Sequence, residues 1–195
     1  MLRVGLTGGF ATGKSFVGRA LVDLGCHLLQ ADQVGHAVLA PDGEAYAAVI
    51  TEFGRGIVDA DGTIARKRLG EIVFAHPEKL ARLNALVHPA VFDRQEAWFA
   101  QLPANSIAVV EAAIMIETGS YRRYDRIILT VCRPDLQIAR AMERDHLAEA
   151  QVRERLARQM PASEKRKYAH FVIDTSGTPE ETLDQTARVC AQLKR

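Results

Sequence analysis

The chain alternates between short apolar runs and longer segments in which apolar residues recur at helical spacing. A run rich in Val, Ile and Leu and bounded by glycine or charge is typical of a buried strand. The first run is followed by glycines and then by Val17, Leu21 and Leu24 at helical spacing. This order of strand, loop, helix and strand predicts a βαβ unit in an α/β fold with a parallel, five-stranded sheet. The five predicted strands are residues 4–7, 26–31, 106–110, 126–131 and 171–173.

A long stretch between the second and third strands is predicted to be helical. Only residues 56–58 resemble a strand there, and the stretch is too long for a simple crossover connection. We therefore expect a helical subdomain at about 41–103, inserted into a core of about 1–40, 104–135 and 170–195. The helices predicted inside it are 46–53, 66–74, 77–87 and 90–102. Helices are predicted elsewhere at 32–39, 135–145, 148–160, 162–170 and 178–193.

Composition and charge narrow the class of protein. Of the 195 residues, 48% are hydrophobic and 25% charged, which is usual for one globular domain. The net charge of +1 gives no basic field, so we expect no nucleic-acid partner. No apolar run approaches 18 residues and the first residues do not form a signal sequence, so we expect a cytoplasmic protein without membrane contact. We expect a monomer, although the sequence leaves the oligomeric state open.

Three cysteines, Cys26, Cys132 and Cys190, are widely spaced in apolar surroundings. No C-x-x-C pattern or Cys/His ligand spacing accompanies them. We therefore expect buried thiols rather than a zinc site or a disulfide framework.

Residues 8–15, GGFATGKS, match the phosphate-loop pattern G-x-x-x-x-G-K-[ST] in full. Glycines allow a tight turn that aims backbone N–H groups at phosphate oxygens, and the following helix directs its positive end at the same anion. The pattern arises by chance in roughly one chain in a hundred of this size, and here it lies between a strand and a helix, as binding requires. We predict that ATP binds with Mg²⁺ at Gly9, Phe10, Ala11, Thr12, Gly13, Lys14 and Ser15.

Phosphate loops also occur in GTPases and motor ATPases, and two absences favour a kinase. A GTPase would carry an N-K-x-D guanine-reading motif, which the sequence lacks. Motor ATPases usually have an apolar strand that ends in Asp-Glu, whereas the third strand here is followed by the single acid Glu111. In a kinase, Lys14 would neutralise the β- and γ-phosphates and the Ser15 hydroxyl would ligate Mg²⁺.

Two acids follow predicted parallel strands, at the edge of the sheet where such folds bind ligands. Asp32 is predicted to be catalytic and to contact the substrate, because its carboxylate can orient or deprotonate an attacking hydroxyl. The alternative is a helix N-cap, and the two roles are compatible. Glu111 is predicted to hold Mg²⁺ through water or to position the acceptor, and its alternative is an ordinary charge at a strand end.

Arginines gather late in the chain and predict a lid at about 136–169. A kinase must exclude water from ATP and neutralise the charge that develops on the transferred group, and a lid with arginines does both. Arg140 and Arg144 are four residues apart on one predicted helix and therefore share a face. We predict that both are catalytic and that Arg144 also contacts the nucleotide. The next helix carries three further arginines, Arg153, Arg155 and Arg158. Which of the lid arginines, Arg140 and Arg144 included, reaches the γ-phosphate is left open.

Several segments resemble the dephospho-CoA kinase family over residues 4–177, nearly the whole chain. The start VGLTGG leads into the phosphate loop as in that family, and Ala31-Asp32 falls where the family places its acid. The most specific segments are LNALVHP at residues 83–89, EAAIMIETG at 111–119 and AHFVIDTSG at 169–177. The chain departs from the family pattern at Phe16, Gln30, His36, Ala113 and Thr175.

The resemblance implies a P-loop NTPase three-layer sandwich with a helical acceptor-binding insertion and a helical lid. It also implies ATP-dependent phosphorylation of the ribose 3′-hydroxyl of dephospho-CoA to give CoA and ADP, the final step of coenzyme A biosynthesis. His88 would contact the acceptor, and Thr175 and Gly177 would lie on the adenine side. One alternative is another small-acceptor kinase, acting on a nucleoside or nucleotide. A second is a nucleotide-binding regulatory module without transferase activity.

Overall fold

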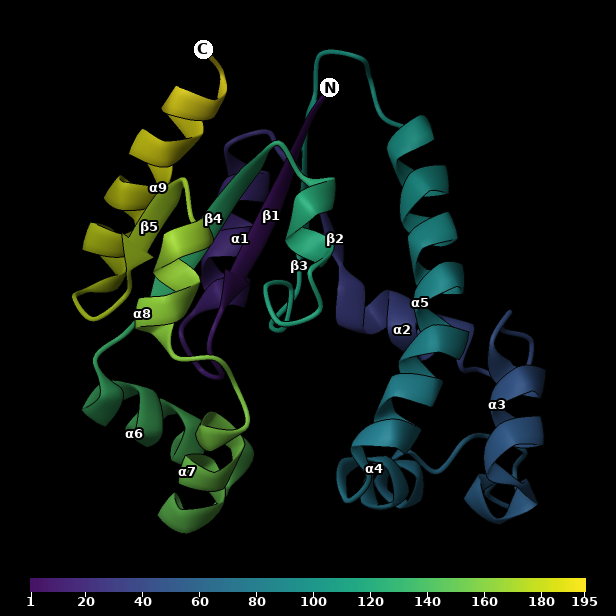
Figure 1. The fold of residues 1–195 in the computed structure, drawn as a ribbon. Helices are drawn as coiled ribbons and strands as arrows, with labels where there is room; N and C mark the ends of the chain where they lie inside the picture. The colour runs from purple at the N-terminus through teal and green to yellow at the C-terminus, as the bar shows by residue number, and fades with distance from the viewer. The chain divides into compact units, whose positions relative to one another are not determined.

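The computed structural model describes residues 1–195 and contains two compact units. A parallel five-stranded sheet forms the centre of the larger unit (Figure 1). The core unit comprises residues 1–30 and 102–195, and the helical unit comprises residues 31–101. The strand order is β2-β3-β1-β4-β5, so β1 pairs with both β3 and β4 at the middle of the sheet. All five predicted strands are confirmed: β1 (Leu2–Gly8), β2 (His27–Gln30), β3 (Ile107–Glu111), β4 (Arg126–Val131) and β5 (Phe171–Asp174).

Side chains from both faces of the sheet are buried, as expected for parallel strands. One face packs on α1 (Lys14–Asp23) and α9 (Pro179–Leu193), which contact each other. The other face packs on Met115 and Ile116 from the segment after β3 and on Met160 and Ala169 near α8 (Ala162–Lys165). The result is the predicted three-layer α/β arrangement.

The predicted lid region contains three helices in the core unit. They are α6 (Pro134–Asp145), α7 (Glu149–Ala157) and α8, and α6 contacts α7. The prediction of one helix over 162–170 was too long, because the α-helix ends at Lys165 and a 3₁₀ turn, Arg166–Tyr168, follows. A further 3₁₀ turn, Ser120–Arg123, lies between β3 and β4.

The helical unit contains α2 (Ala31–Val38), α3 (Tyr46–Phe53), α4 (Arg66–Phe74) and α5 (Pro77–Ala100). One prediction inside it was wrong. Residues 77–87 and 90–102 form one helix, because α5 continues through Pro89 and is held by packing on α2, α3 and α4. Residues 56–58 form no regular strand: a 3₁₀ turn covers Arg55–Ile57, and Val58 makes only an isolated bridge with Ile64.

Two of the three cysteines are buried, as predicted. The sulfur atoms of Cys26 and Cys190 lie 3.8 Å apart as free thiols, and burial, with Cys190 beside it, raises the pKa of Cys26 to about 12. Cys132 is only partly buried, so the prediction was too strong there. No helix is both long enough and apolar enough to cross a membrane.

Candidate active site

The phosphate loop connects β1 to α1 through two left-handed residues. Ala11 has φ of 57° and Gly13 has φ of 76°. This conformation is costly for alanine, so the rest of the loop must hold it in place. Gly13 is the N-cap of α1 and has no side chain to satisfy the first N–H groups of the helix. The loop and the start of α1 therefore present backbone donors and a positive helix end, which suits an anionic ligand.

Lys14 folds back over this loop. Its Nζ donates to the carbonyl oxygens of Gly8 and Gly9, at 3.1 and 2.8 Å. The ammonium group is therefore held at the phosphate loop, where its charge is available to a bound phosphate.

Ser15 and Glu111 are brought together at the carboxyl edge of the sheet. The Ser15 hydroxyl donates to Glu111 Oε1 at 2.9 Å, and Gln30 Nε2 donates to Glu111 Oε2 at 3.4 Å. Glu111 is buried at the end of β3. The two hydrogen bonds compensate its carboxylate for lost hydration and fix its position. No three His, Cys, Asp or Glu side chains cluster to hold a metal by themselves. One hydroxyl and one carboxylate instead fit Mg²⁺, which commonly takes its other ligands from water and phosphates.

Three threonines fix the loop to the neighbouring strand ends. Thr12 Oγ1 donates to Gly9 O at 2.9 Å and lies 2.8 Å from Thr130 Oγ1 on β4. Thr175 Oγ1, just after β5, contacts Thr12 O at 3.2 Å. The role of Thr130 was not predicted from the sequence, although a single hydroxyl within the apolar run of residues 127–131 was the available signal.

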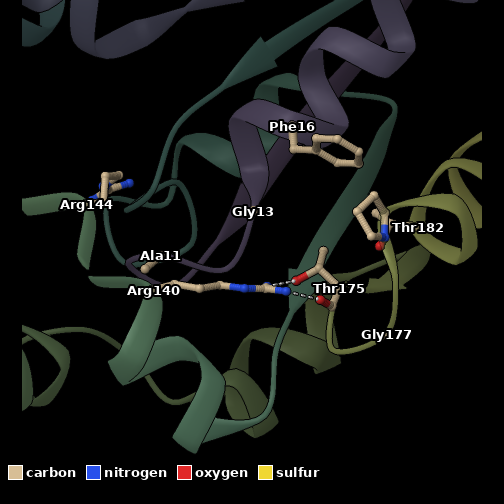
Figure 2. A pocket seen from close by; sticks show the side chains of 9 residues that line it. Ala11, Gly13, Phe16, Arg140, Arg144, Thr175, Gly177 and Thr182 are labelled. Atoms are coloured by element: carbon tan, nitrogen blue, oxygen red, sulfur yellow. Dashed lines mark hydrogen bonds between the residues drawn. The ribbon is translucent and has the colours of Figure 1, made fainter. Parts of the chain in front are cut away.

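A cavity of about 290 Å³ opens beside the loop (Figure 2). Arg140 extends from α6 along it and donates to Thr175, to Oγ1 at 3.2 Å and to the carbonyl oxygen at 2.9 Å. The cavity is close in size to the smaller ligand pockets of proteins, which suits a nucleoside. Three residues that line it had no predicted role: Phe16, Pro179 and Thr182. The other lining residues are predicted site residues: Ala11, Gly13, Arg140, Arg144, Thr175 and Gly177.

Arg144 takes a different direction from Arg140, although only one helical turn separates them (Figure 2). Its Nε and Nη2 donate to the two carboxylate oxygens of Asp145, at 2.8 and 2.9 Å. This pairing raises the pKa of Arg144 and lowers the pKa of Asp145. Arg144 and Arg155 also lie over the Phe10 ring, with Cζ 5.0 and 5.5 Å from its centroid.

Two other lid arginines pair with acids one turn away on the surface. Arg153 contacts Glu149, and Arg158 contacts Glu154. Such exposed pairs are weak and are usual on a solvated helix face.

Asp32 and His88 belong to the helical unit. Asp32 is exposed in the first turn of α2, two residues after β2 ends at Gln30. This position suits a helix-capping charge as well as a catalytic carboxylate. His88 is partly buried on α5, its ring lies 5.6 Å from that of Phe92, and desolvation lowers its pKa.

Comparison with known proteins shows whole-chain similarity to one enzyme family. A sequence model of the family described as dephospho-CoA kinase matches residues 2–181. The dephospho-CoA kinase of Aquifex aeolicus is 37% identical over 195 residues, covering 100% of this chain and 99% of that protein. The Geobacter sulfurreducens enzyme of the same name is 41% identical over 180 residues and 91% of each chain. Among solved structures, TT1252 from Thermus thermophilus has a TM-score of 0.88 at 27% identity, covering 98% of this chain and 96% of that one.

Proposed function

Because the chain belongs to the dephospho-CoA kinase family, we propose that it transfers the γ-phosphoryl group of ATP to the ribose 3′-hydroxyl of dephospho-CoA. The products are CoA and ADP, and the reaction is the last step of coenzyme A biosynthesis. The observation that carries this assignment is the family match, which runs through both units, from residue 2 to residue 181. The phosphate loop supports it, because its charges and donors are placed for a nucleoside triphosphate.

In the proposed donor site, ATP lies with its phosphates on the loop and its adenosine in the cavity beside Thr175 and Gly177. Lys14 and the lid arginines, Arg140 and Arg144, offset the negative charge on the transferred group. Ser15 and Glu111 would hold Mg²⁺, directly or through water. When bound, Mg²⁺ would neutralise part of the negative charge on the phosphate groups.

In the proposed acceptor step, Asp32 orients the 3′-hydroxyl and accepts its proton. The hydroxyl oxygen forms the new bond to the γ-phosphorus, and the bond to the ADP oxygen breaks in line with it. The support for Asp32 is its place in the chain, since β2 ends at Gln30 beside Glu111 and Asp32 follows two residues later. His88 is proposed to contact the acceptor from the helical unit.

An ADP-release assay with ATP and Mg²⁺ tests the function. We expect release that requires dephospho-CoA, with CoA identified by mass, and little release with AMP, CMP, adenosine or no acceptor. Lys14→Ala enzyme is the matched control for contaminating kinases, because its loop lacks the ammonium charge. Release only with a nucleotide or nucleoside would leave the fold assignment intact and refute the acceptor. ATP binding without release on any acceptor would instead indicate a regulatory module.

A further inference from the structure

Phe10 is the phosphate-loop residue on which side chains of the lid converge. Its ring lies beneath two guanidinium groups, Arg144 from α6 and Arg155 from α7. At 5.0 and 5.5 Å from the ring centroid, both cations are within the range of attraction to an aromatic face. One aromatic ring of the loop therefore contacts both consecutive helices of the lid.

The backbone of Phe10 is held by residues of the same lid region. Its N–H donates to Gln159 Oε1 at 2.8 Å, and its carbonyl oxygen accepts from Gln137 Nε2 at 2.5 Å. Gln137 belongs to α6 and Gln159 follows α7, so each helix segment supplies one amide and one guanidinium. Fixing the peptide groups on both sides of the residue restricts the direction in which its ring can point.

Asp145 holds the same two arginines by their charge. Its carboxylate accepts two hydrogen bonds from Arg144 and lies 3.9 Å from Arg155 Nη1. Two neighbouring guanidinium groups repel each other, and a carboxylate together with an aromatic face compensates that repulsion. Arg144 and Arg155 remain about half exposed, so they are held without being withdrawn from solvent or from a ligand.

We propose that Phe10 is a positioning residue for phosphoryl transfer: its ring holds Arg144 and Arg155 of the lid beside the phosphate loop. The inference rests on the proposed kinase reaction and deepens it, because it names the contact that places the lid charges. The role proposed for the ring is to hold these two guanidinium groups, not to contact the reacting atoms. Its contribution should appear more in turnover than in ATP affinity, since Lys14 and the loop backbone, which hold the phosphates, stay in place when the side chain of residue 10 changes. Arg144 also lines the nucleoside cavity, so we expect a small loss of ATP affinity as well.

The test compares Phe10→Leu with Phe10→Tyr, because leucine keeps an apolar side chain and tyrosine also keeps the aromatic face. We expect Phe10→Leu to lower kcat about tenfold, the size expected for losing two modest cation–π contacts, with ATP affinity by calorimetry within about twofold of wild type. Phe10→Tyr should retain most of the turnover. Phe16→Leu is the matched control, because that aromatic residue lines the nucleoside cavity and should change the KM for ATP.

A double-mutant cycle with Arg144→Met shows whether Phe10 acts through the arginine. If it does, Phe10→Leu should cost less in the Arg144→Met background than in wild type. Independent losses in kcat would overturn the proposal. So would a Phe10→Leu enzyme with wild-type kcat, or equal losses in the leucine and tyrosine variants.

A second readout does not depend on the reaction. Without its aromatic platform the lid should open more often, so trypsin should cleave Phe10→Leu after Arg144 and Arg155 about five times faster than Phe10→Tyr. Unchanged cleavage would contradict the proposal even if turnover fell. Faster cleavage in a chain that shows no kinase activity with any acceptor would refute the proposed function and leave the lid contact in place.

Discussion

The core unit and the helical unit carry the two halves of the proposed reaction in different ways. In the core unit the predicted donor residues are held by hydrogen bonds within that unit: Lys14 on loop carbonyls and Ser15 on Glu111. In the helical unit Asp32 is exposed on the first turn of α2, and His88 has a ring contact with Phe92. The residues proposed for the donor half are therefore prearranged within one unit, whereas two residues proposed for the acceptor half, Asp32 and His88, belong to the other.

The variant with the largest expected effect is Asp32→Asn, which tests whether the helical unit supplies the carboxylate that accepts the proton. If the carboxylate accepts the hydroxyl proton, kcat should fall by about 10²- to 10⁴-fold because asparagine cannot act as a base. ATP affinity should stay within about twofold, since the donor residues lie in the core unit. Single-turnover kinetics and calorimetry measure the two quantities.

Asp42→Asn is the matched control, because Asp42 is another exposed acid of the helical unit. It should leave kcat unchanged. If Asp32→Asn were equally harmless, Asp32 would be a capping charge only, and the helical unit would contribute grip on the acceptor but no proton transfer.

The second test concerns the rigidity of the core unit. Lys165 is 1% exposed, and its Nζ donates to Ala113 O at 2.7 Å and pairs with Glu117 at 2.9 Å. This contact ties α8 to the segment that follows Glu111. Lys165→Met should lower the free energy of unfolding by about 1–3 kcal/mol, because Ala113 O and the Glu117 carboxylate lose their charged hydrogen-bond donor. Urea unfolding measures the change.

Restoring neutrality should recover part of that loss. We expect the double variant Lys165→Met with Glu117→Gln to be more stable than Lys165→Met alone, since no unpaired charge remains. Lys167→Met is the control, because that lysine makes an exposed pair with Glu164 and should change stability too little to measure. Equal losses at Lys165 and Lys167 would mean that burial does not strengthen the Lys165 pair.

The sequence predicted the structure of the core unit better than that of the helical unit. In the core, strand patterns and the loop motif are local, so β1, the phosphate loop and the acid at the end of β3 were predictable. Two sets of contacts could not be predicted: those of the loop threonine with β4 and those of Phe10 with the lid. Each joins residues more than 100 positions apart in the sequence. In the helical unit, the proline at 89 led to two predicted helices, since proline disfavours a helix interior. Tertiary packing of α5 overrides that local preference.

The smallest expected effect tests the burial of His88 in the helical unit. Desolvation lowers the pKa of His88, so the fold favours its neutral ring. The unfolded chain then binds more protons near pH 6, and stability must rise with pH. The contribution is complete above the unfolded pKa of about 6.5 and is lost as pH falls through the lower folded value.

The measurement is the thermal midpoint of wild type and His88→Phe at pH 7.5 and pH 5.5. Phenylalanine keeps a ring next to Phe92 but cannot titrate, so this variant should lose less stability on acidification than wild type does. Because the ring is only partly buried, we expect the difference to be at most about 3 °C. Identical slopes in wild type and His88→Phe would show that the His88 ring remains hydrated, which would make the helical unit more open around α5 than its packing indicates.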